Sequence, residues 1–218
     1  MLKRMSGLIV TGLLSWIAVI GPGSSAALAQ SSGAAGNNAL TARETADGWS
    51  LLFDGKSLNG WSPNGDADWQ VEDGAITFTK AGGMLISTKA FGNFELKAEF
   101  YPESNTNSGI FLRCPAGTPP SSRVCYEVNI YDAHATDPTG SIVGIHSTLP
   151  ERAQTSAKWN SFEMTASGTH LVITLNGKAT TDIVDEKLKV MNGTIVLQAG
   201  GPGGPGRIKF RNIKIRPL

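Results

Sequence analysis

Two stretches of alternating residues, 107–114 and 125–132, carry the side chains best suited to chemistry. Alternation with period two is typical of a β-strand that has one face on a core and the other face free. The side chains placed off the core by this alternation are Arg113, Glu127, Asn129 and Tyr131. A cation, a carboxylate, an amide and a phenol on one open sheet face are suited to a polyhydroxylated ligand. The alternative is a solvated polar face, on which a cross-strand Arg–Glu pair contributes only about 0.2–1 kcal/mol.

Two of the three histidines, His134 and His146, lie in the long segment 133–158. Because loops on a rigid sheet are where function concentrates, both are candidates for proton transfer or ligand binding. They are too far apart in sequence to form a local metal motif, so the sequence predicts no metal site and leaves the cofactor open. The third histidine, His170, lies on a predicted strand and is interpreted as a surface or packing residue.

The common catalytic motifs are absent from the sequence. It contains no phosphate-cradling GxxxxGK, no zinc-binding HExxH and no CxxC, and no GxSxG stands at a strand-to-helix turn. These absences disfavour a nucleotide-dependent enzyme and a serine hydrolase.

The pattern of the whole chain predicts an all-β sandwich or barrel. Short strands are separated by turn signals, and no segment has the periodicity of an amphipathic helix. The clearest hairpin joins 69–72 to 75–78 through Asp73-Gly74. The segment 94–100 alternates strictly, and the residues expected to face the core are Phe94, Leu96, Ala98 and Phe100.

The first part of the chain is predicted to direct export. Residues 1–29 combine a basic start, an apolar run over 8–20 and a small-residue cleavage site at Ala27-Leu28-Ala29, as a signal peptide does. The apolar run is shorter than a membrane span requires, so we expect no membrane anchor after cleavage and a periplasmic or extracellular location. Residues 30–45 are predicted to be a flexible linker, and 46–218 a single β-sandwich domain.

The charge balance excludes some partners. Removal of Lys3 and Arg4 with the signal peptide leaves 17 basic residues against 18 acidic ones. A nucleic-acid or anionic-membrane surface needs a clustered basic excess, so we expect no nucleic-acid partner. The sequence does not indicate an oligomeric state.

The two cysteines, Cys114 and Cys125, bracket a loop rich in proline, glycine and serine. Each lies at the end of a predicted strand, and the two strands are expected to pair. In an exported protein this arrangement predicts a disulfide bond, which would stabilise the fold by about 3 kcal/mol in the chain-entropy model.

Several segments together resemble the 3-keto-disaccharide hydrolase domain, a family once known only as a domain of unknown function. The resemblance covers essentially the whole domain in order, through GWSLLFDGKSLNGW (48–61), WQVEDG (69–74), FELKAEF to NSGIFLR (94–113), YEVNIYD (126–132), WN (159–160), LNG (175–177) and FRNI (210–213). It implies a concanavalin-like or laminarinase-like jelly roll of two curved antiparallel sheets, with a carbohydrate site on the concave face. The chain departs from the family at 197–201, where LQAGG replaces LQDHG or LQYHG. Any role of that family histidine is here either vacant or filled by His146 or His134.

The resemblance implies an exported enzyme that cleaves 3-keto-glycosides. A ketone at C3 acidifies the proton on C2, so the reaction needs a base and a group that stabilises the enolate oxygen. The predicted catalytic residues are Arg113, as the donor that stabilises the enolate oxygen, and Glu127 or a loop histidine such as His146, as the base. The predicted substrate-binding residues are Asn107, Asn129, Tyr131, His134 and Trp159.

Two other functions remain open from the sequence. One is a non-catalytic glycan-binding module of the lectin or laminin-G type on the same face, and the other is a structural or adhesive envelope domain. Ordinary glycosidase chemistry needs a pair of carboxylates, and the strand that carries Glu127 has Asn129 two positions on in place of a second acid.

Overall fold

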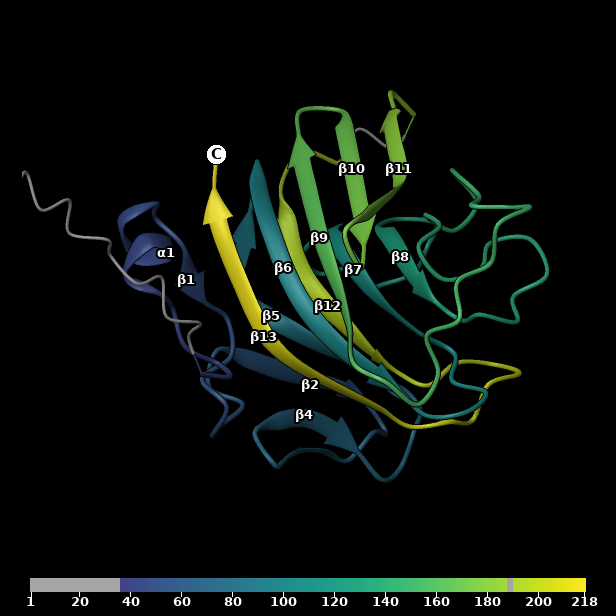
Figure 1. Ribbon diagram of the computed structural model, residues 1–218, viewed down its shortest axis with the longest axis horizontal. Helices are drawn as coiled ribbons and strands as arrows, with labels where there is room; N and C mark the ends of the chain where they lie inside the picture. The colour runs from purple at the N-terminus through teal and green to yellow at the C-terminus, as the bar shows by residue number, and fades with distance from the viewer. Residues whose placement is uncertain (1–35, 188–189) are drawn as a thin grey trace, which may run out of the picture. The chain divides into compact units, whose positions relative to one another are not determined.

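Two antiparallel β-sheets packed face to face form the body of the protein (Figure 1). The structure is a computed structural model that describes residues 36–187 and 190–218. The predicted signal peptide and the first residues of the predicted linker lie outside these ranges. Within the described ranges, no helix is both long enough and apolar enough to cross a membrane.

The larger sheet has eight strands in the order β11-β10-β9-β6-β13-β4-β3, and β1 also pairs with β13. Its members are β1 (Ser50–Leu51), β3 (Trp69–Glu72), β4 (Ala75–Phe78), β6 (Phe94–Pro102), β9 (Asn160–Ser167), β10 (His170–Leu175), β11 (Lys178–Val184) and β13 (Ile208–Pro217). The predicted hairpin over 69–78 is confirmed as β3 and β4. Asp73 and Gly74 have φ values of 52° and 73°, as a tight hairpin turn requires.

The smaller sheet has five strands in the order β2-β5-β12-β7-β8. Its members are β2 (Trp61–Gly65), β5 (Gly83–Phe91), β7 (Ser108–Cys114), β8 (Tyr126–Ile130) and β12 (Gly193–Ala199). The alternating stretches 107–114 and 125–132 contain β7 and β8, which pair directly with each other. The predicted jelly-roll sandwich of two antiparallel sheets is confirmed.

The core lies between the sheets and follows from the alternation of each strand. The four predicted inward residues of β6 are all buried, namely Phe94, Leu96, Ala98 and Phe100. Ile110 of β7 and Val128 of β8 enter the same hydrophobic cluster from the smaller sheet, and both are fully buried. Truncation of such an isoleucine to alanine commonly costs about 2–5 kcal/mol, so these residues hold the smaller sheet against the larger one.

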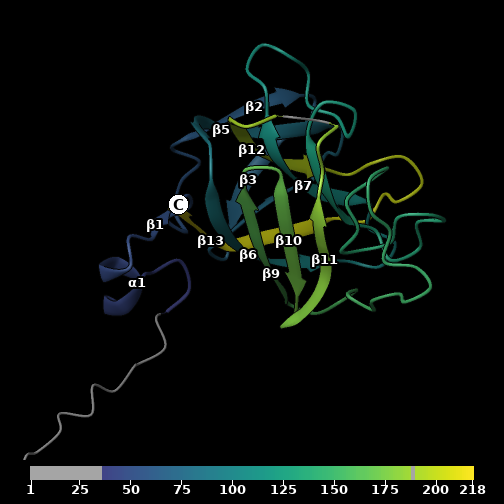
Figure 2. The same ribbon diagram turned by 90° about the horizontal axis from the view of Figure 1, so that it is seen from above.

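The predicted flexible linker differs from the structure over its described part. Residues Ala42–Ala46 form the short helix α1, which Thr41 caps through a reciprocal pair of hydrogen bonds with Glu44 (Figure 2). Lys214 on β13 donates to the Glu44 carboxylate at 2.9 Å. Asn38 and Asn212 also exchange backbone-to-side-chain hydrogen bonds. Contact with the last strand therefore begins near residue 38, before the predicted domain start at 46.

The long segment after β8 joins the free edges of the two sheets. Its residues 140–143 run alongside β8, where the Val143 amide donates to the Glu127 carbonyl oxygen at 3.0 Å. On the other side, the Thr180 and Thr181 hydroxyls of β11 donate to the Gly140 carbonyl oxygen at 3.1 and 3.3 Å. This segment therefore closes one side of the sandwich and is held at a fixed place beside β8.

Candidate functional site

The candidate site lies on the outer face of the five-stranded sheet. In β7 and β8, alternate side chains point into the core, and the intervening ones point away from it. Phe111 and its cross-strand partner Glu127 are on the outer face, as the alternation predicts. Phe111 and Val196 form a small second hydrophobic cluster there, so the floor beside Glu127 is apolar.

Glu127 lies in a space that a glycine leaves open. A Cβ atom on Gly109 would come within 3.2 Å of both Cγ and Oε1 of Glu127. Because glycine has no side chain, the carboxyl group can lie back against the backbone of β7 and lose much of its contact with solvent. A side chain at position 109 would crowd this carboxyl group, so the glycine gives it room.

The surroundings of Glu127 favour its neutral form. Burial is the main cause that raises the pKa of its carboxyl group, the negative charge of Asp137 raises it further, and a hydrogen bond from Ser122 opposes both. The resulting pKa is about 7. Among the described residues, no lysine, arginine or histidine forms an ion pair with this carboxylate. A carboxyl group of this kind exchanges a proton near neutral pH, as a general base or acid must.

The predicted disulfide between Cys114 and Cys125 is confirmed. It closes the loop over 115–124 at the end of β7 and β8, and both cysteines pack in the same small cluster as Phe111. Ser122, which hydrogen-bonds to Glu127, belongs to this loop. The disulfide therefore holds in place the loop whose Ser122 contacts the candidate site.

The prediction that Arg113 lies on the open face is wrong. Its side chain is fully buried, with the guanidinium donating to the carbonyl oxygens of Gly92 at 2.9 Å and Gly168 at 2.6 Å and to Oδ1 of Asn93 at 3.0 Å. The cause is local backbone geometry: Arg113 has a φ of 55°, and the pairing of β7 with β12 shifts register at this point. Such an irregularity ends the alternation and turns the side chain toward the loops of the other sheet.

Asn129 is on the outer face but is not open to a ligand. Only 1% of its surface is exposed, because the segment after residue 136 covers it. Its amide nitrogen donates to the carbonyl oxygen of Asp137. The predicted role in substrate binding therefore does not fit this position, and Asn129 instead holds Asp137 near Glu127.

Asn107 and Tyr131 lie at the far end of the same face and support the glycine-rich loop over 200–206. The Asn107 amide nitrogen donates to the carbonyl oxygen of Pro202 at 2.7 Å, and the Tyr131 hydroxyl donates to that of Gly203 at 3.0 Å. Both side chains remain partly exposed. They can therefore border a ligand, although each has one hydrogen bond within the protein.

His134 lies against Tyr131, with their ring centroids 5.8 Å apart in an edge-to-face arrangement. Its Nδ1 accepts a hydrogen bond from the Asp137 amide at 2.9 Å. Asp137 thus contacts His134 through its backbone and influences Glu127 through its charge. The structure brings Glu127, Asp137 and His134 to one part of the face.

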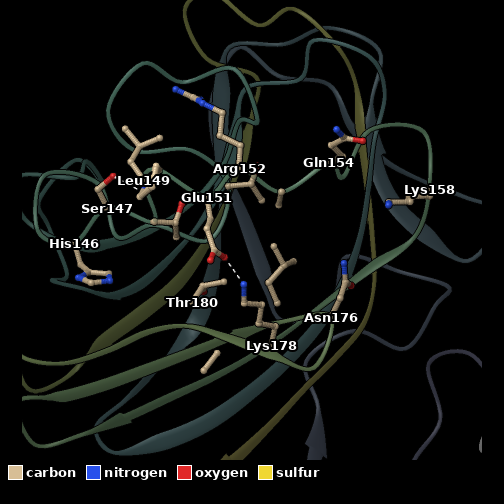
Figure 3. A pocket seen from close by; sticks show the side chains of 16 residues that line it. His146, Ser147, Leu149, Glu151, Arg152, Gln154, Lys158, Asn176, Lys178 and Thr180 are labelled. Atoms are coloured by element: carbon tan, nitrogen blue, oxygen red, sulfur yellow. Dashed lines mark hydrogen bonds and ion pairs between the residues drawn. The ribbon is translucent and has the colours of Figure 1, made fainter.

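His146 lies in a different place. It lines a cleft of about 760 Å³ between the segment 146–158 and the β10–β11 turn (Figure 3). An ion pair between Glu151 and Lys178 spans this cleft. The residues that line it include none of Glu127, Asp137 or His134. The structure therefore does not bring His146 together with the predicted base.

Trp159 is on the opposite side of the sandwich. Its ring stacks under the Arg211 guanidinium at 3.7 Å and meets Tyr101 edge-on, with ring centroids 5.6 Å apart. Arg211 in turn pairs with Glu99 across β13 and β6, on the outer face of the eight-stranded sheet. The prediction that Trp159 shares a binding site with Glu127 is therefore wrong, because the two residues belong to different faces.

Two residues of the site were not predicted from the sequence. Asp137 lies in the long segment 133–158, and Ser122 lies in the loop between the cysteines. Ser122 could have been identified from the sequence, because it lies shortly before Glu127 in the loop that the predicted disulfide closes. Within residues 36–187 and 190–218, no cluster of three or more histidine, cysteine, aspartate or glutamate side chains could hold a metal ion.

Comparison with known proteins identifies relatives. The model of the 3-keto-alpha-glucoside-1,2-lyase-like domain family matches residues 48–216. A protein of Bacteroides thetaiotaomicron named 3-keto-disaccharide hydrolase is 40% identical over 79 residues, which are 30% of this chain and 27% of that protein. The match thus spans only about a quarter of the relative's length.

Solved structures support the fold. A candidate glycosyl hydrolase from Parabacteroides distasonis is similar over 84% of this chain and 100% of its own, with a TM-score of 0.71 and 22% identity. The carbohydrate-binding module CBM66 from Bacillus subtilis is similar over 72% of this chain and 95% of its own, with a TM-score of 0.54 and 15% identity. At these identities the likeness shows the shared architecture alone.

Proposed function

Because the chain belongs to the 3-keto-alpha-glucoside-1,2-lyase-like domain family, we propose that it cleaves 3-keto-glycosides by elimination followed by hydration. The observation that carries this proposal is the Glu127 carboxyl group, with a pKa of about 7 on the outer face of the five-stranded sheet. A base of this strength is well matched to the proton on a carbon next to a ketone at neutral pH.

In the proposed first step, the Glu127 carboxylate takes the proton from C2 of the 3-keto sugar. The electron pair of the C2–H bond moves toward the carbonyl group, and the C3 oxygen becomes an enolate oxygen. The enolate then expels the glycosidic oxygen from C1 and leaves a C1–C2 double bond. The proton held by Glu127 passes to the departing oxygen, so the carboxylate is regenerated.

In the second step, water adds across the C1–C2 double bond. The oxygen of water bonds to C1 and a proton returns to C2, so the net reaction is hydrolysis. Glu127 is the group that delivers and removes protons in both steps. A positioned base or acid of this kind typically contributes about 10²–10⁴-fold to the rate.

We also propose that the enzyme works outside the cytoplasm. The support is the predicted signal peptide over residues 1–29 together with the disulfide, which persists in oxidising compartments. N-terminal sequencing of secreted protein tests this, and a mature chain that retains Lys3 would contradict it.

The test of the activity compares a 3-keto-disaccharide with the corresponding ordinary disaccharide and follows release of the free sugar. We expect turnover of the keto form alone, and a loss of about 10²–10⁴-fold in Glu127→Gln. Glu99→Gln is the matched control, because Glu99 is a paired carboxylate on the other outer face. Binding without turnover of either sugar would contradict the proposal and would favour a glycan-binding module.

A further inference from the structure

The proposed elimination leaves one requirement that Glu127 cannot meet. As the C2 proton departs, negative charge develops on the C3 oxygen, and a donor aimed at that oxygen is worth about 10²–10³-fold in rate. Arg113 was the predicted donor. Its guanidinium is instead buried and bound to Gly92, Gly168 and Asn93, so another group on the outer face has to supply the hydrogen bond.

His134 has the chemistry for this role because the backbone determines which of its ring nitrogens carries the proton. Nδ1 of His134 lies 2.9 Å from the Asp137 backbone nitrogen, which can only donate. A ring nitrogen that accepts a hydrogen bond carries no proton, so the neutral ring has its proton on Nε2. His134 is therefore a hydrogen-bond donor through Nε2–H.

The ring is also held in place by its neighbours. Its edge-to-face contact with Tyr131 restricts rotation on one side. The Arg152 guanidinium donates to the carbonyl oxygens of Asp132 at 3.0 Å, His134 at 2.7 Å and Ala135 at 3.3 Å, which fixes the backbone on the other side. A donor held in this way needs little reorganisation when charge develops on the substrate.

One short segment connects this donor to the proposed base. The Asp137 amide binds the His134 ring, the Asp137 carbonyl oxygen is held by Asn129, and the Asp137 carboxylate acts on Glu127. Asn129 lies on β8 two residues from Glu127 and on the same face. The spacing between base and donor is therefore set by a rigid strand and by two hydrogen bonds to Asp137.

We propose that Nε2–H of His134 donates a hydrogen bond to the C3 oxygen of the 3-keto sugar and stabilises its enolate form. This inference rests on the proposed function. No proton leaves His134 in the step: the C2 proton goes to Glu127, the electron pair goes toward the C3 oxygen, and the imidazole stays neutral. His134 is thus a catalytic residue that acts as a donor and not as a second base.

The first test is nitrogen NMR of the histidine rings in the wild-type protein, recorded under conditions in which the spectra show neutral rings. We expect His134 to carry its proton on Nε2. A signal showing the proton on Nδ1 would overturn the proposal. This measurement needs no substrate, so it is independent of whether the protein turns over a 3-keto sugar.

The second test is kinetic. His134→Phe removes the donor, and we expect kcat on a 3-keto-disaccharide to fall about 10²–10³-fold while KM changes little. His134→Gln keeps an N–H near the place of Nε2, so we expect it to recover at least tenfold over the phenylalanine variant. The same change at an exposed histidine of the other sheet, His170→Phe, is the control and should leave both constants unchanged.

The outcomes separate this inference from the proposed function. Loss of activity in Glu127→Gln with full kcat in a folded His134→Phe would overturn the donor and leave the base in place. Loss in His134→Phe with full activity in Glu127→Gln would overturn the base. Equal loss in His134→Gln and His134→Phe, with unchanged melting temperatures, would also contradict the donor.

Discussion

The two outer faces of the sandwich treat their carboxylates in opposite ways. On the eight-stranded sheet each of the strand carboxylates named here has a cationic partner, and the pairs are Glu95–Arg216, Glu99–Arg211, Lys97–Glu163 and Glu72 with both Arg207 and Lys209. On the five-stranded sheet, Glu127 has an apolar floor, a hydroxyl and another acid nearby.

Glu72 and Glu127 show what this difference means for chemistry. Hydrogen bonds from Lys209 and then Arg207 lower the pKa of Glu72, whereas burial raises that of Glu127 to about 7. The same residue type is therefore charged at neutral pH on one face and able to exchange a proton near neutral pH on the other. Ion pairs keep the carboxylates of one face charged, whereas Glu127 on the other face has the kind of perturbed pKa that is common at functional sites.

The largest effect that we predict separates two arginines. Arg113→Met should destabilise the fold by about 3–5 kcal/mol, because it leaves buried carbonyl oxygens and Asn93 without their donor. Arg211→Met, on the paired outer face, should cost only about 1–2 kcal/mol through its ion pair and its contact with Trp159. Urea unfolding of both variants measures this. Equal stability of Arg113→Met and wild type would contradict the burial of Arg113 and would mean that its side chain lies on an open face.

The next effect is a pH dependence of opposite sign for the two glutamates. The folded pKa of Glu127 is raised from 4.5 to about 7, so its contribution to stability is present below pH 4.5 and is lost as pH rises to about 7. The pKa of Glu72 is lowered, so its contribution is present above 4.5 and is lost on acidification. Melting temperatures of wild type and Glu127→Gln should therefore agree at low pH and separate as pH rises to about 7, with wild type becoming the less stable. Those of wild type and Glu72→Gln should differ at neutral pH, with wild type the more stable, and should agree only at acidic pH, where the ion pairs of Glu72 break. Parallel curves for wild type and Glu127→Gln would show that Glu127 has an ordinary pKa.

A smaller effect concerns Ser122 in the disulfide-closed loop. Its hydroxyl favours the charged form of Glu127, so Ser122→Val should raise the pKa of Glu127 further, by about half to one pH unit. The acidic limb of kcat/KM should move to higher pH by the same amount. Ser122→Thr has nearly the shape of valine but keeps the hydroxyl, so it should titrate like wild type. Identical profiles for the valine and threonine variants would exclude a hydrogen bond from this loop.

The smallest effect is expected on the paired face. Glu99→Gln should change stability by less than about 1 kcal/mol, because it weakens a single partly exposed ion pair. Its kcat/KM should equal that of wild type over the whole pH range. A loss of activity in this variant would mean that the eight-stranded sheet takes part in substrate binding. Trp159, which contacts the Arg211 partner of Glu99, would then again be a candidate for substrate binding.

Much of the fold could be predicted from local patterns. Period-two alternation located β6, β7 and β8 and their buried faces, and Asp73-Gly74 located a hairpin. The spacing of Cys114 and Cys125 around a turn between paired strands predicted the disulfide. These features depend on residues close together in the chain, so the sequence by itself determined them. The place of Glu127 on an outer face follows from the same alternation.

Long-range packing decided which of the candidate residues share a site. A register shift against β12 sends Arg113 into the interior, and a segment that returns over β8 covers Asn129 and brings Asp137 to Glu127. Trp159 and Glu127 are assigned to opposite faces by the order of strands in two different sheets. Alternation tells which side of its own strand a residue occupies, but only the tertiary structure decides what lies over that side, because the covering segments come from distant parts of the chain.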